Sequence, residues 1–328
     1  MARGPAARDE LEGVVRVAFG PGRRLAAVQR LCGGSKKGVY RLSLDDGRTV
    51  IGYIWSAAEN YWPAPRGPAA DAEPFGEASG AGLFEAAGAR LAAVGVRTPR
   101  VYLLDRTLTV YPAEIALVED VRGGTLEQWL ERGDPGGQQA LLRLAAALRA
   151  MHGCRGRQIG RVALADGGVA PSGRTCEQIV LDRALGHLAD ATSRVGRVAA
   201  AHDALEAVTA GLAAEVQPRA DYRLIHGELG PDHVLIDERG EPVLIDVEGL
   251  MFFDVEWEHV FLRLRFDEHY QSLREDGLDE ERLRFYRLAM HLSLIAGPLR
   301  LLDGDFPDRE PMLRIVEYNI GKALEFVR

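Results

Sequence analysis

Apolar and polar positions follow two different periods along the chain. In the first third, short apolar runs end at glycine, proline or aspartate, which is typical of strands. Glycine-bearing turns join the first three runs as antiparallel neighbours. Five strands are expected, around Leu31 and at residues 39–42, 49–55, 99–104 and 113–118.

Much of the remaining chain has apolar residues three and four positions apart, the spacing of amphipathic helices. Residues 154–174 are rich in glycine and lack periodicity, so a loop is expected there. Residues 1–22, rich in Ala, Gly, Arg and Pro, predict a flexible leader with one amphipathic segment, Leu11–Phe19. The pattern indicates an α+β fold. Helices are expected at 80–94, 126–131, 138–151, 176–195, 199–216, 256–262, 283–302 and 311–326.

A cluster of polar side chains surrounds one predicted hairpin, in which residues 234–236 and 243–245 flank a turn at 237–240. A hairpin brings the start of its first strand next to the end of its second. We therefore expect an acid-rich loop and a carboxylate pair at one end of a small sheet, as a metal and phosphate site requires. The alternative is that the loop side chains only cap and hydrogen-bond a buried turn. The side chains are His226, Glu228, Asp232 and His233 before the hairpin, and Asp246 and Glu248 after it.

In order and spacing these motifs resemble those of the aminoglycoside phosphotransferase and choline kinase group, small-molecule kinases with a protein-kinase-like fold. Residues 226–233 stand at the group's catalytic loop and residues 245–248 at its metal-binding motif. The resemblance implies a bilobal α+β protein. A small lobe with a five-stranded antiparallel sheet is expected at 23–120, and a larger, mostly helical lobe at 121–328. The implied cofactors are ATP or GTP, and Mg²⁺.

The resemblance also assigns roles to the hairpin residues. Glu228 stands where the group has its catalytic aspartate, and it is expected to orient the substrate hydroxyl as the base. Asp246 is the expected principal metal ligand. His233 stands at a second metal-binding position, although imidazole suits softer metals than Mg²⁺, so it can instead act through water or hydrogen-bond the loop. Asp254 is expected to brace the catalytic loop.

Nucleotide contacts are implied at two further places. In the resembled fold a glycine-bearing turn covers the nucleotide phosphates, although such a turn alone is also a common hairpin connection. The backbone near Glu119 and Val121 is expected to pair with the purine edge, and Thr125 to cap the following helix. The turn consists of Gly33, Gly34, Ser35, Lys36, Lys37 and Gly38.

One departure from the family pattern concerns the lysine that contacts the nucleotide phosphates. Its strand position is occupied by Tyr53, and two of the chain's three lysines, Lys36 and Lys37, lie in the glycine turn. One hypothesis is that a turn lysine replaces the strand lysine. The other is that both are solvated charges and the nucleotide site is degenerate. Glu85 falls at the lobe-bridging glutamate position, but without its lysine partner it is equally well a surface charge.

Net charge, apolar runs and cysteine spacing argue for or against several classes of function. A net charge of −8 argues against a nucleic-acid partner and is compatible with a cationic substrate. The absence of a long apolar run or a signal-peptide pattern predicts a cytoplasmic protein without a membrane segment. The three cysteines lack metal-site spacing. Acidic residues of the C-terminal half are either a solvated surface or attract a cationic substrate: Glu256, Glu258, Asp267, Glu268, Glu275, Asp276, Asp303 and Asp305.

Two functions are therefore considered. The first is an ATP- or GTP-dependent kinase that phosphorylates a hydroxyl of a small molecule, such as an aminoglycoside, another antibiotic or a metabolite. The second is an inactive kinase-like binding or regulatory protein, which the missing strand lysine and the changed loop residues favour. The carboxylates retained at Glu228 and Asp246 favour the enzyme.

Overall fold

The computed structural model describes residues 8–31, 34–63, 74–76, 79–166 and 173–328. The chain divides into two compact units. The first consists of residues 1–62, 77–147 and 231–249, and the second of residues 63–76, 148–230 and 250–328. The hairpin at 234–245 thus groups with the N-terminal sheet and not with the helices of the second unit. A boundary between functional lobes at residue 120 stays a prediction.

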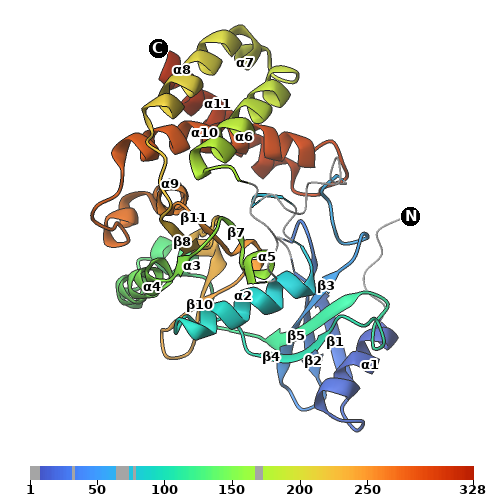
Figure 1. Cartoon of the computed structure of the whole chain (residues 1–328). Coiled ribbons are helices and arrows are strands. Elements are labelled where there is room, and N and C mark those ends of the chain that lie inside the picture. The colour runs from blue at the N-terminus through green and yellow to red at the C-terminus, as the bar shows by residue number, and fades with distance from the viewer. Residues whose placement is uncertain (1–7, 32–33, 64–73, 77–78, 167–172) are drawn as a thin grey trace. The chain divides into compact units, whose positions relative to one another are not determined.

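The first unit is built on a five-stranded sheet of order β1-β2-β3-β5-β4, in which every neighbouring pair is antiparallel (Figure 1). The predicted five-stranded antiparallel sheet is confirmed. The first strand begins earlier than expected, and Leu31 follows it. The strands are β1 Leu25–Arg30, β2 Gly38–Leu44, β3 Thr49–Trp55, β4 Val101–Asp105 and β5 Glu114–Glu119.

One face of this sheet is covered by helix α1, Arg8–Phe19. Leu11 and Val14 of α1 lie in one apolar cluster with Ile54 of β3, and all three are almost completely buried. Within the range 1–22 expected to be a flexible leader, the described residues Arg8–Phe19 therefore form a packed helix. The amphipathic pattern gives the reason, because an apolar stripe on a helix is stabilised by packing on a sheet.

The opposite face of the sheet is covered by helix α2, Ala81–Ala93 (Figure 1). Side chains alternate between the faces of a strand, so Tyr53 and Trp55 point away from α1. Their rings lie 5.7 and 5.6 Å, centroid to centroid, from the ring of Phe84 on α2. Tyr53 and Trp55 are both less than a tenth exposed. The candidate site is built on this second face.

The predicted hairpin is present in the first unit. Strand β9, Val234–Ile236, pairs antiparallel with β10, Pro242–Leu244. The carboxylate of Asp237 accepts hydrogen bonds from the backbone N–H groups of Arg239 and Glu241, at 2.8 and 2.9 Å, which closes the turn. Short 3₁₀ turns flank the hairpin, η1 Pro231–His233 before it and η2 Val247–Gly249 after it.

Helix α3, Leu126–Glu131, begins at the predicted cap. The hydroxyl of Thr125 accepts a hydrogen bond from the backbone N–H of Gln128, and the Gln128 side chain accepts one from the backbone N–H of Thr125, both at 3.2 Å. This reciprocal capping box satisfies two of the unpaired donors at the helix start. Helix α4, Pro135–Gly153, follows.

The second unit contains a small sheet of order β6-β8-β11-β7. Residues 154–174, expected to form a loop, supply two of its strands and the short helix α5, Val162–Asp166. Each of those two strands has only two residues, too few for an alternating pattern to be visible in the sequence. The strands are β6 Arg155–Gly156, β7 Gly160–Arg161, β8 Tyr222–Ile225 and β11 Met251–Phe253.

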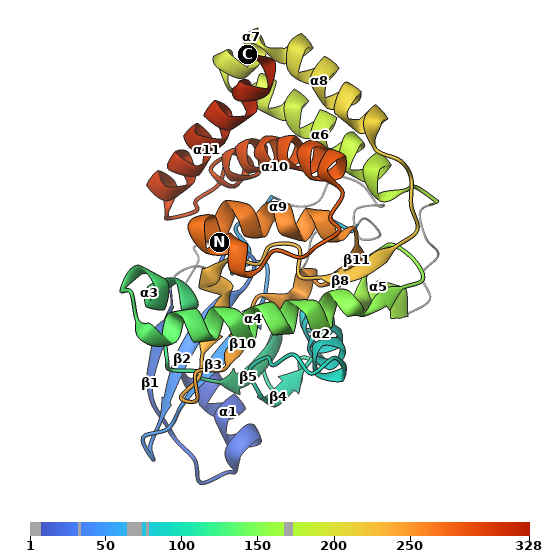
Figure 2. The same cartoon turned by 90° about the vertical axis from the view of Figure 1, so that its left-hand side faces the viewer.

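Helices form the rest of the second unit, as predicted. Helix α10 is central and packs against α6, α9 and α11 (Figure 2). Its Phe285, Tyr286 and Leu288 are fully buried in a large apolar cluster that also includes residues of α6 and α9. The helices are α6 Cys176–Thr192, α7 Gly196–Ala200, α8 His202–Glu215, α9 Val255–Phe266, α10 Glu280–Leu301 and α11 Arg309–Leu324, with 3₁₀ segments η3 Asp267–Ser272 and η4 Glu325–Val327.

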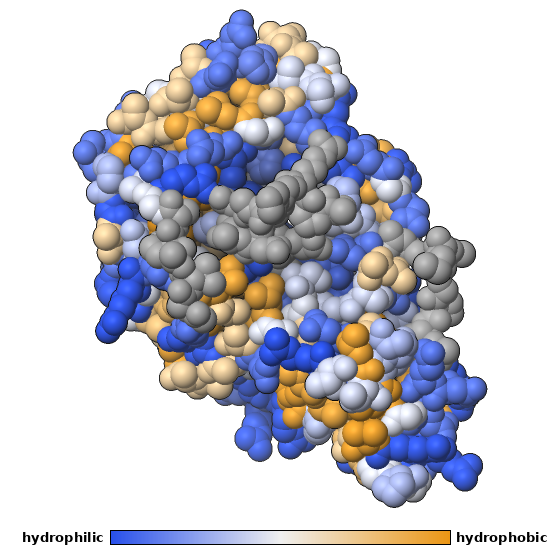
Figure 3. Space-filling view, turned by 45° about the vertical axis from the view of Figure 1, so that its right-hand side comes forward, coloured by the Kyte–Doolittle hydropathy of each residue, from blue (hydrophilic) through white to orange (hydrophobic). Residues whose placement is uncertain are grey.

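Hydrophilic residues cover much of the surface visible in Figure 3, and apolar residues gather in separate patches between them. Such a mixture is usual for a folded protein, since apolar atoms contribute much of any protein surface. Among the helices of the described residues, we find none with the length and apolar character needed to cross a membrane.

Buried histidines of the second unit predict a loss of stability in acid. Burial lowers the pKa of His187 and of His259 to about 3, and neighbouring positive charge adds to the effect. Both stay neutral in the folded protein at pH 5, whereas in the unfolded chain both take up a proton near pH 6.5. The free energy of unfolding should therefore fall by about 2 kcal/mol per histidine between pH 7 and pH 5.

Urea unfolding at pH 7 and pH 5, followed by circular dichroism, measures this loss. His187→Gln should remove part of the pH dependence, because Gln does not titrate. His202→Gln is the matched control, since His202 lies at the start of α8 and is only partly buried. An equal pH dependence in wild type and His187→Gln would contradict the prediction.

Candidate nucleotide and metal site

Lys37 and two carboxylates form the centre of the candidate site in the first unit. The Lys37 Nζ atom lies 2.8 Å from Oδ1 of Asp246 and 2.5 Å from Oε1 of Glu248. Lys37 and Glu248 are 7% and 5% exposed, whereas about half of the Asp246 side chain is accessible. Segments more than 200 residues apart in the sequence thus meet through one ammonium group.

Aromatic side chains of β3 complete the surroundings of the Lys37 ammonium group. The Nζ atom lies 5.1 Å from the ring centroid of Tyr53, within the range of a cation–π contact. The indole N–H of Trp55 donates a hydrogen bond of 3.2 Å to Oε1 of Glu248. Tyr53, which is expected to stand at the lysine position of the resembled family, therefore faces the lysine that comes from the turn.

Electrostatics keep Lys37 and Asp246 ionised at neutral pH. Burial by itself would lower the pKa of Lys37, but the charges of Asp246 and Glu248 outweigh it and raise that pKa. The Lys37 charge holds the pKa of Asp246 well below its usual range. Burial, with the nearby carboxylates, raises the pKa of Tyr53 to about 12, so its hydroxyl stays protonated.

The hairpin positions Asp246 two residues after Leu244, the last residue of β10. The backbone N–H of Ile245 donates a 3.0 Å hydrogen bond to the carbonyl of His233, which ties the two ends of the hairpin together. Asp246 has a φ of 58°, a left-handed conformation that residues other than glycine seldom adopt. Such conformations persist where the surrounding structure enforces them, often at functional sites. His233 Nε2 lies 4.0 Å from Oδ2 of Asp246.

The glycine turn ends in Lys37 and is fixed by aromatic side chains. A Cβ atom at Gly34 would lie 2.4 Å from the carbonyl oxygen of Lys37, so the turn requires glycine there. The Lys36 ammonium lies 5.7 Å from the ring of Trp62, whose indole N–H donates a 3.0 Å hydrogen bond to the Ser35 hydroxyl. Gly33, also expected in this turn, lies outside the described residues.

Gly38 of the turn and Glu119 of the segment expected to pair with the purine edge are each fixed by contacts. A Cβ atom at Gly38 would lie 2.6 Å from the buried carboxylate of Glu59, so a side chain would not fit. Glu119 ends β5, and its carboxylate accepts hydrogen bonds of 2.7 and 3.1 Å from Arg97 and from the backbone of Arg100. Val121 is largely buried. The side chain of Glu119 is therefore engaged, and recognition through the backbone stays a prediction.

The chain matches a family model. That model, the phosphotransferase enzyme family, covers residues 33–292, well over half of the chain. The chain belongs to the phosphotransferase enzyme family. The matched range includes both the Lys37 turn and the hairpin with Asp246, and the predicted family resemblance is confirmed. No curated protein matches the sequence.

Solved structures of similar fold cover almost the whole chain. A thermostable mutant of the aminoglycoside phosphotransferase APH(4)-Ia, in its apo form, has a TM-score of 0.65 and 17% identity, over 97% of this chain and 98% of that one. Spectinomycin phosphotransferase APH(9)-Ia, in complex with ADP and spectinomycin, has a TM-score of 0.65 and 14% identity, over 98% and 99%. LicA in complex with AMP gives 0.62 and 12%, over 98% and 100%. These likenesses confirm the predicted fold.

In the second unit, the stretch at the family's catalytic loop follows β8. The backbone N–H of Gly227 donates a 2.6 Å hydrogen bond to Oε2 of Glu258 on α9. Gly227 has a φ of 88°, and a Cβ atom there would lie 3.0 Å from the Met251 side chain. Glu228 is the next residue and is exposed to solvent. The loop backbone is thus fixed immediately before the expected base.

The residue that braces this loop differs from the expectation. Asp254 is fully buried, and its carboxylate accepts hydrogen bonds from Arg282 and Tyr286, both at 2.5 Å, and from Arg219 at 3.1 Å. It therefore joins α9 to α10. The contact to the loop comes instead from Glu258, one helical turn further along α9.

The structure also shows the surroundings of three other acidic residues that the sequence singled out. Glu85 is exposed and pairs with Arg106 at 3.2 Å, so the surface-charge alternative is correct for it. Glu256 and Glu258 are fully buried, and Glu256 forms an ion pair with Arg219. Buried and paired carboxylates do not attract a substrate from solvent. The sequence patterns could not reveal this, because both lie on a helix that is buried on nearly all sides.

The donor atoms near Lys37 fit a hard divalent cation such as Mg²⁺. Asp246 and Glu248 supply two negative charges against one positive charge, and Oε2 of Glu248 is a buried oxygen without a hydrogen-bond partner among the described residues. Carboxylate oxygens are preferred Mg²⁺ ligands. His233 fits less well, since its imidazole suits softer metals. Glu248 was named in the sequence motif but given no role, and its burial beside Lys37 indicates one.

Proposed function

We propose that this family member is a nucleotide-dependent phosphotransferase that adds phosphate to a hydroxyl group of a small molecule. The observation that carries the proposal is the Lys37 ammonium, held beside Asp246 and Glu248 on the face of β3 where the family's lysine position lies. Phosphoryl transfer is catalysed mainly by positioning and by neutralising charge on the phosphates. A buried cation next to two carboxylates provides these groups.

Proteins of similar fold support a nucleotide and a small acceptor. APH(9)-Ia has been solved with ADP and spectinomycin, and a thermostable APH(4)-Ia mutant with AMP-PNP and hygromycin B. By analogy we propose ATP, or GTP, as the phosphate donor and a hydroxylated antibiotic or metabolite as the acceptor. The net charge of −8 is compatible with a cationic acceptor.

In the proposed mechanism each polar residue has one task. Lys37 binds the nucleotide phosphates and replaces the lysine absent at position 53. Asp246, with Glu248 beside it, would hold the metal, and a bound Mg²⁺ would neutralise charge on the phosphate oxygens. Glu228 orients the acceptor hydroxyl and accepts its proton. The backbone near Glu119 and Val121 is proposed to pair with the base of the nucleotide.

Calorimetric titration with ATP and with GTP, each with and without Mg²⁺, tests this function. Binding that requires Mg²⁺, followed by phosphate transfer to a compound from a panel of hydroxylated antibiotics and metabolites, would support it. Binding without transfer to any acceptor or to water would favour the inactive kinase-like protein. No binding of either nucleotide at about 1 mM, an affinity near 4 kcal/mol, would refute the proposal.

Glu228→Gln is expected to lower kcat by roughly 10²- to 10³-fold and to leave the nucleotide Kd nearly unchanged, because the amide keeps the size of the side chain but does not accept the proton. Steady-state kinetics with the identified acceptor measure the effect. Glu228→Asp keeps the carboxylate and should retain much of the activity. Glu215→Gln, an exposed residue at the end of α8, is the control. An unchanged kcat in Glu228→Gln would exclude Glu228 as the base.

A further inference from the structure

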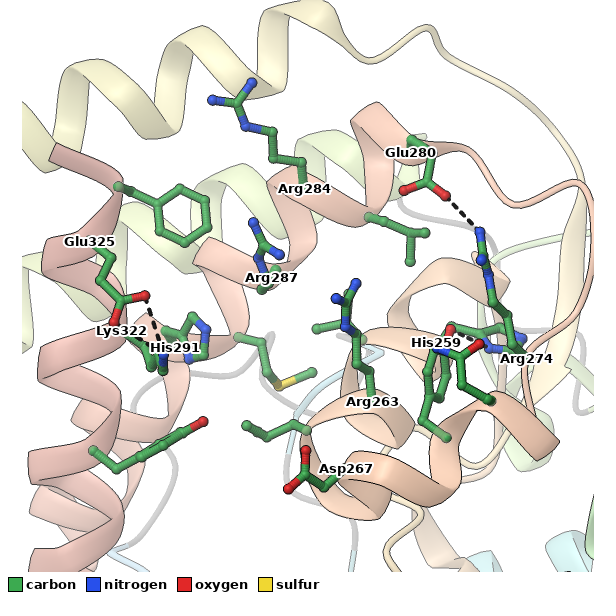
Figure 4. Close-up of a pocket in the computed structure, with 18 residues that line it drawn as sticks. His259, Arg263, Asp267, Arg274, Glu280, Arg284, Arg287, His291, Lys322 and Glu325 are labelled. Atoms are coloured by element: carbon green, nitrogen blue, oxygen red, sulfur yellow. Dashed lines mark hydrogen bonds and ion pairs between the residues drawn. The ribbon is translucent and has the colours of Figure 1, made fainter. Parts of the chain in front are cut away.

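A large cavity opens between the C-terminal helices of the second unit, with a volume of about 1040 Å³ (Figure 4). Its walls come from α9, η3, α10, α11 and η4. None of the residues assigned to the phosphotransferase site lines it. The volume is at the upper end of the range for small-molecule sites, so the cavity has room for an organic ligand.

The charge of the cavity is opposite to that of the protein. Five cationic and three acidic side chains line it, in a chain whose net charge is −8. Burial lowers the pKa of both lining histidines, His259 and His291, so they are neutral at pH 7 and available as uncharged hydrogen-bonding groups. A concave surface concentrates the potential of its charges. The cavity is therefore a local attractor for anions.

The cationic side chains are not all balanced by carboxylates. Arg274 pairs with Glu280 at 3.0 Å, and Lys322 with Glu325 at 3.1 Å, at opposite sides of the cavity (Figure 4). Arg263 of α9 and Arg287 of α10 are different. In the part of the chain that the structure describes, neither forms an ion pair or a hydrogen bond with a carboxylate.

These two arginines line the cavity from different helices, and both side chains point into it (Figure 4). Partial desolvation, together with the positive charges of Arg263 and Arg284, lowers the pKa of Arg287. Like charges brought together in this way destabilise each other, and an anion between them would remove the repulsion. Arg287 is held in place by the ring of Phe326, at 5.2 Å, which leaves its N–H donors available.

We propose that this cavity is a binding site for a small organic phosphate, whose phosphate group lies between Arg263 and Arg287 and whose non-polar part rests on the apolar wall. Guanidinium groups bind phosphate with paired, charge-assisted hydrogen bonds. Leu264, Met290 and Tyr318 contribute to the apolar wall. The proposal does not depend on the phosphotransferase activity.

Phenyl phosphate combines both parts of such a ligand and is the probe, with inorganic phosphate for comparison. Calorimetric titrations are done without nucleotide and without Mg²⁺, at constant ionic strength. Phenyl phosphate should bind saturably and more tightly than inorganic phosphate. Arg263→Gln and Arg287→Gln should each weaken its binding by about tenfold or more, the loss of one charge-assisted contact. Both side chains reach solvent, so neither change should prevent folding.

Two controls locate the binding. Arg314→Gln removes the same charge from an exposed position of α11 outside the cavity and should leave the affinity unchanged. Lys37→Met removes the cation of the proposed nucleotide site and should also leave it unchanged. Absence of saturable binding to wild type, equal affinity in the cavity variants and wild type, or loss of binding in Lys37→Met alone would each overturn the proposal. Because Glu228 and Asp246 play no part, a failure here leaves the phosphotransferase proposal untouched.

Discussion

Replacing Asp246 by Asn is expected to abolish Mg²⁺-dependent nucleotide binding and to lower any phosphotransferase kcat by roughly 10³-fold or more. Asp246 is the accessible carboxylate next to Lys37, and the Lys37 charge keeps it ionised. The amide of Asn has nearly the same shape but lacks the charge that attracts a divalent cation and balances Lys37. Calorimetry with ATP and with GTP, in the presence and absence of Mg²⁺, measures the loss directly.

The control for Asp246→Asn is Glu241→Gln, which removes a half-exposed carboxylate from the same hairpin, where it pairs with Arg143 at 3.4 Å. Glu241→Gln should bind nucleotide like wild type. Thermal melting shows whether either variant disturbs the fold. Full Mg²⁺-dependent binding by a folded Asp246→Asn variant would mean that the metal is held elsewhere, and the role proposed for this hairpin would be wrong.

Lys37→Met is the second change with a large expected effect. Nucleotide affinity and kcat should together fall about 10²-fold, because the phosphates lose their buried cation. Stability should fall as well, by about 3 kcal/mol, because Asp246 and Glu248 are left without their partner. Methionine keeps most of the length and apolar volume of the side chain, so the loss is mainly one of charge. Binding titrations and urea unfolding separate the two effects.

Lys36→Met shows whether nucleotide binding requires Lys37 in particular or any positive charge in the turn. Lys36 lies over the Trp62 ring, and its charge lowers the pKa of Asp246 less than the charge of Lys37 does, so its replacement should reduce nucleotide affinity less than Lys37→Met. A double variant gives a stronger test. In Lys37→Met/Tyr53→Lys an ammonium group returns to β3, whose residue 53 ring already lies 5.1 Å from the Lys37 Nζ atom.

The double variant should recover part of the nucleotide binding that Lys37→Met loses. A larger loss in Lys36→Met than in Lys37→Met would contradict the assignment of the phosphate-binding lysine. The comparison also bears on how this site departs from its family. The resemblance places the family's lysine position on β3, whereas we propose that here the cation comes from the end of the turn before β2, where Lys37 lies over the Tyr53 ring. A charge required at one point in space can be supplied from a strand or from the turn that precedes its neighbour.

Much of the fold could be predicted from the sequence because periodicity is a local property. The alternation along β2, β3 and β5, the capping box at Thr125 and the hairpin at residues 234–245 each depend on a few neighbouring residues. The two-residue strands β6 and β7 were missed for the same reason, since so short a stretch has no period. Helix α1 appeared in the sequence only as an amphipathic segment, and its packing on the sheet depended on distant residues.

The sequence by itself determined the family, the order of the elements and the chemical types of residue at the hairpin, because these are properties of the chain as it is written. Tertiary structure decided which charges meet. It placed Lys37, and not Lys36, between Asp246 and Glu248, assigned the support of the loop to Glu258 instead of Asp254, and brought Arg263 and Arg287 to one cavity. The physical reason is that electrostatic interactions depend on distance and burial in three dimensions, and separation along the sequence determines neither.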